Sequence, residues 1–215
     1  MKKIYVSLAV IAIAFASCKK EEKVEPEAAE TMSDTIVHEE IAPEQPMDST
    51  AMAQAWEKYM TPSEPHKMMA DEVGKWDCEM TFWMAPDAPP ETYKSIANIK
   101  MIMGGRYQES MYSGEMMGMP FEGRATVAYD NAANEYTSTW IDNMGTGLMV
   151  MKGKMKEGSN SMTLKGETID PMTGKTCNMR EVYTIVDENT RKMEMYDNKM
   201  GEGHKNMEIV MRRKM

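Results

Sequence analysis

From residue 73 onward, apolar and polar side chains alternate with a period of two. In the first such run, Trp76, Cys78, Met80 and Phe82 are separated by single polar residues. This alternation is typical of a β-strand with one face buried and the other in solvent. Nine further runs of the same kind follow, at residues 92–103, 106–117, 120–130, 135–143, 147–156, 161–169, 177–186, 191–199 and 205–213.

Turn-forming residues separate these runs, and the pattern indicates no helix between them. Glycine pairs, Asp-Asn and Asp-Pro steps mark the turns, as in an antiparallel meander. Closing the strands into a barrel removes the exposed edges that a sandwich would leave. The sequence therefore predicts an all-β fold over residues 73–215, an antiparallel up-and-down barrel of about ten strands.

Short helices and an acidic linker are expected before the barrel. Met52, Trp56 and Tyr59 have helical spacing within residues 49–60, with Asp48 or Ser49 as the N-cap. A second short helix should begin at Ser63, so that helices occupy residues 49–72. Residues 18–48 hold ten acidic side chains and three lysines. Such a segment buries too little apolar surface to fold, so we expect a disordered linker.

The N-terminus has the layout of a bacterial export signal. Lys2 and Lys3 precede an uncharged run, residues 4–15, which is too short to cross roughly 30 Å of hydrocarbon as a helix. Small residues then stand directly before Cys18, which resembles the lipobox of bacterial lipoproteins. The resemblance implies a signal peptide over residues 1–17 and lipidation of Cys18. An ordinary signal peptide with a coincidental cysteine is the alternative.

This resemblance implies a position outside the cytoplasm, on the cell envelope. Several acyl chains anchor a protein stably where one would not. Lys19 stands where an Asp would favour the inner membrane, so we expect the outer membrane, at its periplasmic face or the cell surface. Removing Lys2 and Lys3 moves the formal charge from −9 to −11. That charge disfavours nucleic acid and anionic lipid as partners, which leaves membrane contact through the lipid anchor only. A protein partner remains unknown.

Two further cysteines, Cys78 and Cys177, lie in the predicted barrel. An oxidising compartment permits a disulfide between them. Two separate buried thiols are the alternative, and the sequence leaves both open.

The first predicted strand opens with Gly74-Lys75-Trp76-Asp77, directly after a predicted short helix. This start is similar to the Gly-x-Trp entry of lipocalin-like barrels. In that superfamily the Trp closes one barrel end, and an Arg from a late strand packs across it. The resemblance assigns the closing role to Trp76 and Arg213, which shares the face of Met207 and Met211; Arg212 is the other candidate.

Several specific runs are spread over residues 60–215. They are Phe82-Trp83-Met84 with Ala88-Pro89-Pro90, Gly118-Met119-Pro120-Phe121-Glu122-Gly123, Ser138-Thr139-Trp140-Ile141-Asp142, Asp170-Pro171-Met172-Thr173-Gly174-Lys175, Met179-Arg180-Glu181-Val182 and Glu194-Met195-Tyr196-Asp197. With these runs, residues 60–215 resemble the bacterial family called domain of unknown function 1579. The resemblance implies a lipocalin-like barrel and carries no assigned activity.

The period-two pattern also predicts which side chains point into the barrel. An inward carboxylate costs several kcal/mol unless it is paired, so Glu181 either contacts an arginine, Arg106 or Arg213, or faces a ligand. An eight-to-ten-stranded barrel is wide enough to hold one small ligand. The predicted ligand-binding residues are Met80, Met101, Trp140, Met149, Met151, Glu181, Met193 and Met195.

Methionine accounts for 28 of the 215 residues. Thioethers select Cu(I), and pairs such as Met149 and Met151 place two of them on one strand face. Flexible core packing by a Met-biased composition is the alternative, and it also explains Met32 and Met47 outside the barrel.

The sequence offers no motif for catalysis or for a bound cofactor. Its three histidines, His38, His66 and His204, form no triad or zinc pattern with the other residues, and no glycine-rich phosphate loop occurs. His204, the barrel candidate for a haem ligand, is expected to lie in a solvated turn.

Three functions remain. The leading prediction is a non-enzymatic barrel that binds a small apolar or amphipathic ligand in a cavity of roughly 300 Å³ or more. The alternatives are a Cu(I)-binding protein and an envelope lipoprotein whose outer surface binds a partner.

Overall fold

The computed structural model describes residues 48–85, 88–199, 201 and 203–215. The predicted signal peptide, the lipidation of Cys18 and nearly all of the acidic linker fall outside these residues. None of the helices in the described part is both long and apolar enough to cross a membrane.

Two short helices precede the sheet. The first, α1 (Ser49–Met60), begins at Asp48, whose side chain accepts hydrogen bonds from the Thr50 and Ala51 amides at 2.7 and 2.9 Å. None of the α1 residues is buried, and Trp56 remains 57% exposed. The second helix, α2 (Glu64–Ala70), buries His66 and Met69. The apolar side of α1 therefore adds little to the core, whereas α2 is part of it.

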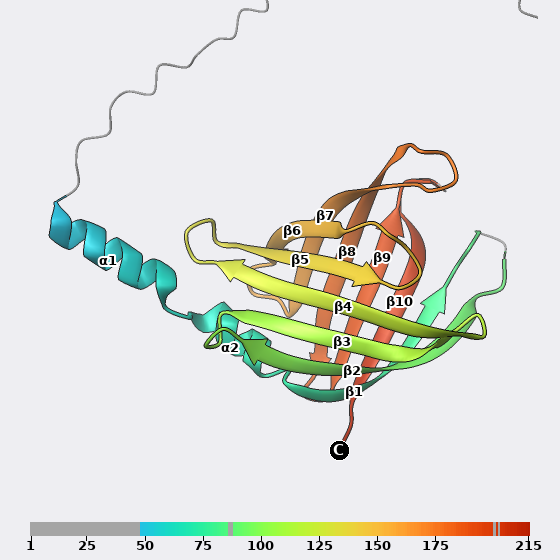
Figure 1. The fold of residues 1–215 in the computed structure, drawn as a ribbon, viewed down its shortest axis with the longest axis horizontal. Helices are drawn as coiled ribbons and strands as arrows, with labels where there is room; N and C mark the ends of the chain where they lie inside the picture. Colours follow the sequence, from blue (N-terminus) through green and yellow to red (C-terminus); the bar gives the residue numbers. More distant parts are fainter. Residues whose placement is uncertain (1–47, 86–87, 200, 202) are drawn as a thin grey trace, which may run out of the picture. The chain divides into compact units, whose positions relative to one another are not determined.

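Ten antiparallel strands form one closed barrel, in which each strand pairs with its sequence neighbours and β1 pairs with β10 (Figure 1). The all-β, up-and-down barrel predicted from the period-two pattern is confirmed. The strands are β1 (Gly74–Phe82), β2 (Glu91–Ile102), β3 (Tyr107–Met116), β4 (Met119–Asp130), β5 (Glu135–Asp142), β6 (Met149–Met155), β7 (Ser161–Ile169), β8 (Thr176–Asp187), β9 (Thr190–Asp197) and β10 (His204–Arg213).

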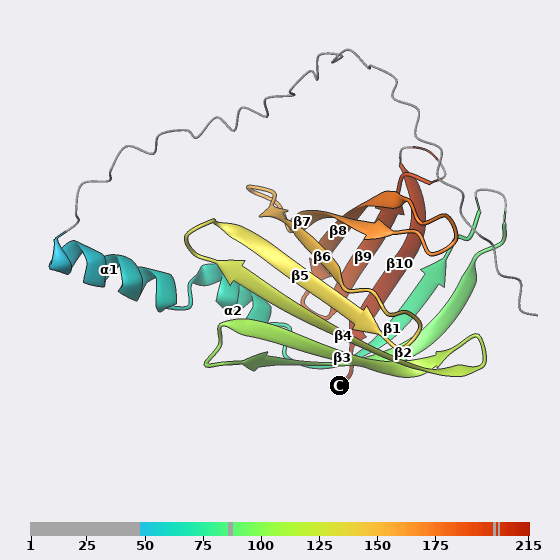
Figure 2. The ribbon, with the colours of Figure 1, turned by 45° about the horizontal axis from the view of Figure 1, so that its top comes forward.

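The two ends of the barrel differ. Helix α2 packs on β2 and β3 at the end where β1 begins and β10 finishes, which we call the α2 end (Figure 2). The turns at residues 117–118, 143–148 and 170–175 lie at the opposite end, which we call the rim end. The α2 end is thus covered by the chain that leads into the barrel.

A buried ion pair holds the α2 end together. Glu72, between α2 and β1, accepts from Arg191 Nε at 3.0 Å, and both side chains are at most 10% exposed. The same carboxylate accepts from Gln108 Nε2 at 2.9 Å and from the Tyr183 hydroxyl at 2.5 Å. Gln108, Tyr183 and Arg191 come from β3, β8 and β9, so one side chain links the α2 segment to both sides of the barrel.

Trp76 lies beside this network and is fully buried. Its indole N–H donates to the Glu72 carbonyl at 2.8 Å. The Arg213 guanidinium lies 4.3 Å from the ring centroid and donates to the carbonyls of Val73 and Asp71. Arg213, and not Arg212, therefore takes the position across the tryptophan.

Cys78 and Cys177 are free, buried thiols. They lie on β1 and β8, which β10 and β9 separate in the sheet. Burial raises the pKa of the Cys78 thiol to about 11, so this thiol is protonated at neutral pH. Of the two alternatives, the structure contains the separate thiols.

Replacing Arg191 by Met should destabilise the barrel by about 3–5 kcal/mol, because the Glu72 charge would stay buried without its cation. Lys192→Met is the matched control on the same strand. Lys192 is a half-exposed partner of Glu194, so its loss should cost less than about 1 kcal/mol. Urea unfolding at pH 7 measures both free energies; equal losses would contradict the role given to the buried pair.

Candidate ligand cavity

The barrel interior contains a cavity of about 260 Å³ toward the rim end. Its wall is mostly thioether and aromatic, with a few polar groups. The lining residues are Met80, Phe82, Tyr112, Met116, Phe121, Ala125, Ser138, Trp140, Asp142, Met144, Met149, Glu181, Met193, Met195, Met207 and Ile209. This rim cavity is slightly smaller than the roughly 300 Å³ expected from the sequence.

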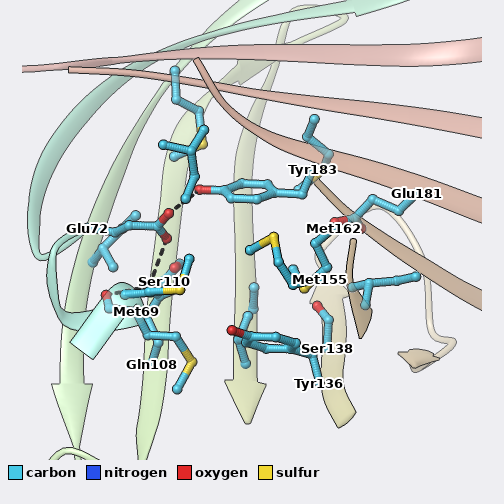
Figure 3. A pocket seen from close by; sticks show the side chains of 18 of the residues that line it. Met69, Glu72, Gln108, Ser110, Tyr136, Ser138, Met155, Met162, Glu181 and Tyr183 are labelled. Carbon is cyan, nitrogen blue, oxygen red and sulfur yellow. Dashed lines mark hydrogen bonds between the residues drawn. The ribbon is translucent and has the colours of Figure 1, made fainter. Parts of the chain in front are cut away.

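A second cavity of about 80 Å³ lies between the rim cavity and the α2 end (Figure 3). Glu72, Gln108 and Tyr183 form part of its wall. The two cavities share five lining residues, which are Tyr112, Ala125, Ser138, Glu181 and Met193. The shared residues make this level of the barrel the boundary between the closed end and the space toward the rim.

Glu181 stands at that boundary. It lies on β8, opposite Leu164 of β7 and Met195 of β9, and is 5% exposed. Within the described part of the chain, its side chain has no hydrogen bond or ion pair, whereas dashed lines in Figure 3 join Glu72 to Tyr183 and Gln108. Burial raises the pKa of the Glu181 carboxyl to about 7. The group therefore exchanges its proton near neutral pH and is able to donate or accept a hydrogen bond.

An aromatic cluster forms one wall of the rim cavity. The Trp140 indole N–H donates to Asp142 Oδ2 at 2.6 Å, which fixes the ring. The Tyr112 ring meets it edge to face at 5.2 Å, and the Phe121 ring stacks at 6.4 Å. Gly123 provides the space, because a Cβ there would collide with the Trp140 ring. This wall is consequently pre-formed.

Six of the eight predicted ligand-binding residues line the rim cavity; Met101 and Met151 do not. Met101 is half-buried and packs with the core cluster that contains Met69 of α2. Met151 is 1% exposed and its side chain contacts the space left by Gly166 of β7. Both point inward as predicted, but the period of two gives the face of a strand and not the depth along the barrel axis.

The prediction that Glu181 contacts Arg106 or Arg213 was wrong. Arg106 donates to the Met103 carbonyl, and Arg213 lies over Trp76 at the α2 end. The interior cation is Arg191, which was not predicted. It has the inward parity of Met193 and Met195, so the period of two along this strand could have identified it. Glu72 had no such signal, because it follows a helix and belongs to no strand.

His204 was predicted to lie in a solvated turn, and this was also wrong. It opens β10, opposite Asp197, and its Nε2 is buried without a hydrogen-bond partner among the described residues. It lines neither interior cavity. In the part of the chain that the structure describes, no group of three His, Cys, Asp or Glu side chains is arranged to hold a metal ion.

Glu181 should make stability pH-dependent. Since its pKa is about 7 in the folded protein and near 4.5 when unfolded, the native state binds more protons between these values. Stability should therefore fall as pH rises from 4.5 to 7, by about 3 kcal/mol in total, and stay level above. Glu181→Gln should lose this component and be relatively more stable at pH 8. Glu188→Gln, in an exposed turn, is the control. Urea unfolding at a series of pH values measures the free energy of unfolding. If this free energy changed with pH in parallel for Glu181→Gln and the unmodified protein, the assignment would be contradicted.

Known proteins resemble this chain in its barrel. No curated protein matches it. Among solved structures, Rv2717c from M. tuberculosis is similar at 10% sequence identity and a TM-score of 0.50, over 72% of this chain and 100% of that one. A redesigned beta barrel matches at 13% identity and a TM-score of 0.36, over 68% and 95%. At such identities the likeness to Rv2717c concerns the fold alone. Residues 61–213 match the model of the family described as protein of unknown function, DUF1579, and the chain belongs to that family.

Proposed function

We propose that this protein is a non-enzymatic binding protein, whose barrel holds a small apolar or amphipathic molecule in the rim cavity. The observation that carries the proposal is Glu181, a buried carboxyl without a partner among the described residues, beside an apolar space. An unpaired buried carboxyl costs several kcal/mol. A bound molecule that hydrogen-bonds Glu181 would recover part of this energy.

The volume of the rim cavity limits the size of the ligand. Pockets that hold drug-sized ligands have roughly 300–1,000 Å³, so a cavity of about 260 Å³ suits a small molecule. Thioether side chains are flexible, and the seven methionines in the wall give the cavity some capacity to adapt its shape.

The proposed location follows from the N-terminal sequence. A lipid on Cys18 would anchor the protein to the cell envelope, at the outer membrane, and the acidic linker would separate the barrel from the headgroups. In this arrangement the barrel meets small molecules outside the cytoplasm. The anchor would be its contact with the membrane, and its charge disfavours nucleic acid as a partner.

Octan-1-ol, with nine non-hydrogen atoms, is a suitable probe for the cavity. We expect saturable binding of one molecule per chain in calorimetry of the full-length protein in a non-ionic detergent, with detergent alone as the blank. Ala125→Phe should abolish this binding, because Ala125 lines both cavities and the phenyl ring would enter them. Val150→Phe, at a 39% exposed position on β6, should leave it unchanged. Absence of octanol binding, or equal binding by all three proteins, would contradict the proposal.

Cu(I) binding is the second candidate, favoured by the seven methionines in one wall. They are Met80, Met116, Met144, Met149, Met193, Met195 and Met207. Thioethers are soft ligands that select Cu(I) over harder ions. Four of these residues come from the sequence prediction, and the fold brings them together from β1, β6 and β9.

If Cu(I) is the ligand, affinity should be micromolar or tighter and should fall about tenfold or more when Met149, Met193 and Met195 are changed to Leu. The matched control changes Met117, Met119 and Met172 to Leu, since these are exposed outside the cavity. Competition with a Cu(I) chelator measures both affinities. Equal affinity of the two triple variants would exclude the cavity as the copper site.

A further inference from the structure

The charged groups around the two interior cavities are all acidic. Their described lining residues include Glu72, Asp142 and Glu181, and contain no Lys, Arg or His. Arg191 also has inward parity, but its guanidinium is bound by Glu72 and by the carbonyls of Asp187 and Thr190. The cavity wall therefore presents negative charge to a ligand without a free cation among these residues to balance it.

The three carboxylates differ in what they still can bind. Glu72 accepts from Gln108, Tyr183 and Arg191. Asp142 accepts from the Trp140 indole and, at 2.9 Å, from the Met144 amide. Glu181 lacks any such donor in the described part of the chain, and it faces both cavities. It is thus the carboxylate available for the polar group of a ligand.

The rest of the wall also suits a cation. Aromatic faces carry partial negative charge and attract ammonium groups. Tyr112, Phe121 and Trp140 form such a cluster in the wall that also contains Glu181. A ligand carboxylate or phosphate would instead meet Glu181 with no lysine or arginine of the wall to offset the repulsion.

Resting on the proposed function, we infer that the ligand is a small organic cation, an ammonium group carrying one short alkyl chain, as the volume of about 260 Å³ allows. Its ammonium donates to Glu181 at mid-barrel, and its chain lies among the methionines toward the rim. Met144 lines the cavity and is 40% exposed, so it marks the mouth of the cavity, where the alkyl chain of the ligand would end. The carboxylate and the aromatic cluster then act on the same charged group.

Three probes of one chain length separate charge from apolar burial: octylammonium, octan-1-ol and octanoate. They are titrated by calorimetry into the full-length protein in a non-ionic detergent at pH 8, where Glu181 is mostly ionised and the amine stays protonated. Octylammonium should bind most tightly and octanoate least. Glu181→Gln should lower octylammonium affinity about 10- to 100-fold, as expected for a charge-assisted hydrogen bond. It should lower octan-1-ol affinity less, because a neutral hydroxyl can still hydrogen-bond the glutamine amide.

The outcomes distinguish this inference from the proposed function. If octan-1-ol binds but octylammonium binds no more tightly, or if Glu181→Gln leaves the amine affinity unchanged, the cationic ligand is excluded and the apolar binding site stands. If none of the three probes binds, both are overturned. Glu194→Gln is the control and should not change the order of affinities, because this carboxylate on β9 lines neither cavity and already has two lysine partners.

Discussion

The buried ion pair between Glu72 and Arg191 determines how the rest of the interior is used. It connects the segment after α2 to β9, and Gln108 and Tyr183 extend the same contact to β3 and β8. One end of the barrel is closed by this network, with Trp76 and Arg213 beside it. Because Arg191 is engaged there, it does not neutralise the second interior carboxyl, Glu181.

Glu72 and Glu181 have different roles in the barrel, since one stabilises the fold and the other is available to a ligand. Glu72 accepts hydrogen bonds from Gln108, Tyr183 and Arg191, so it stabilises the closed end. Glu181 lies a short way along the barrel, where burial raises its pKa to about 7 and the neighbouring space is empty of protein atoms. A carboxyl kept in this state is costly to folding, and such costs are typically found at functional sites. The aromatic and thioether wall beside it supplies the apolar part of a binding site.

Much of the fold could be predicted from the sequence, because a period of two identifies both the strands and their inward faces. Met80, Trp140, Met149 and Glu181 were placed correctly by this rule. Depth along the barrel could not be predicted, since every inward position has the same periodicity; Met101 and Met151 therefore lie outside the cavity. Arg191 could have been recognised by parity.

Glu72, the partner of Arg191, could not be recognised from the sequence. The contact joins residues 119 positions apart and depends on how α2 meets the barrel. The prediction that Arg106 or Arg213 lies beside Glu181 was wrong for a related reason. Arg106 lies before β3 and Arg213 near the end of β10, so both act at the ends of strands, while Glu181 lies inside the barrel.

A high-resolution crystal structure of the protein, purified from its native envelope, would show whether the space beside Glu181 is a binding site. We expect discrete density for a small molecule between Glu181 and the Trp140 cluster. Methionine side chains filling that space, with Glu181 hydrogen-bonded to a protein cation, would contradict it.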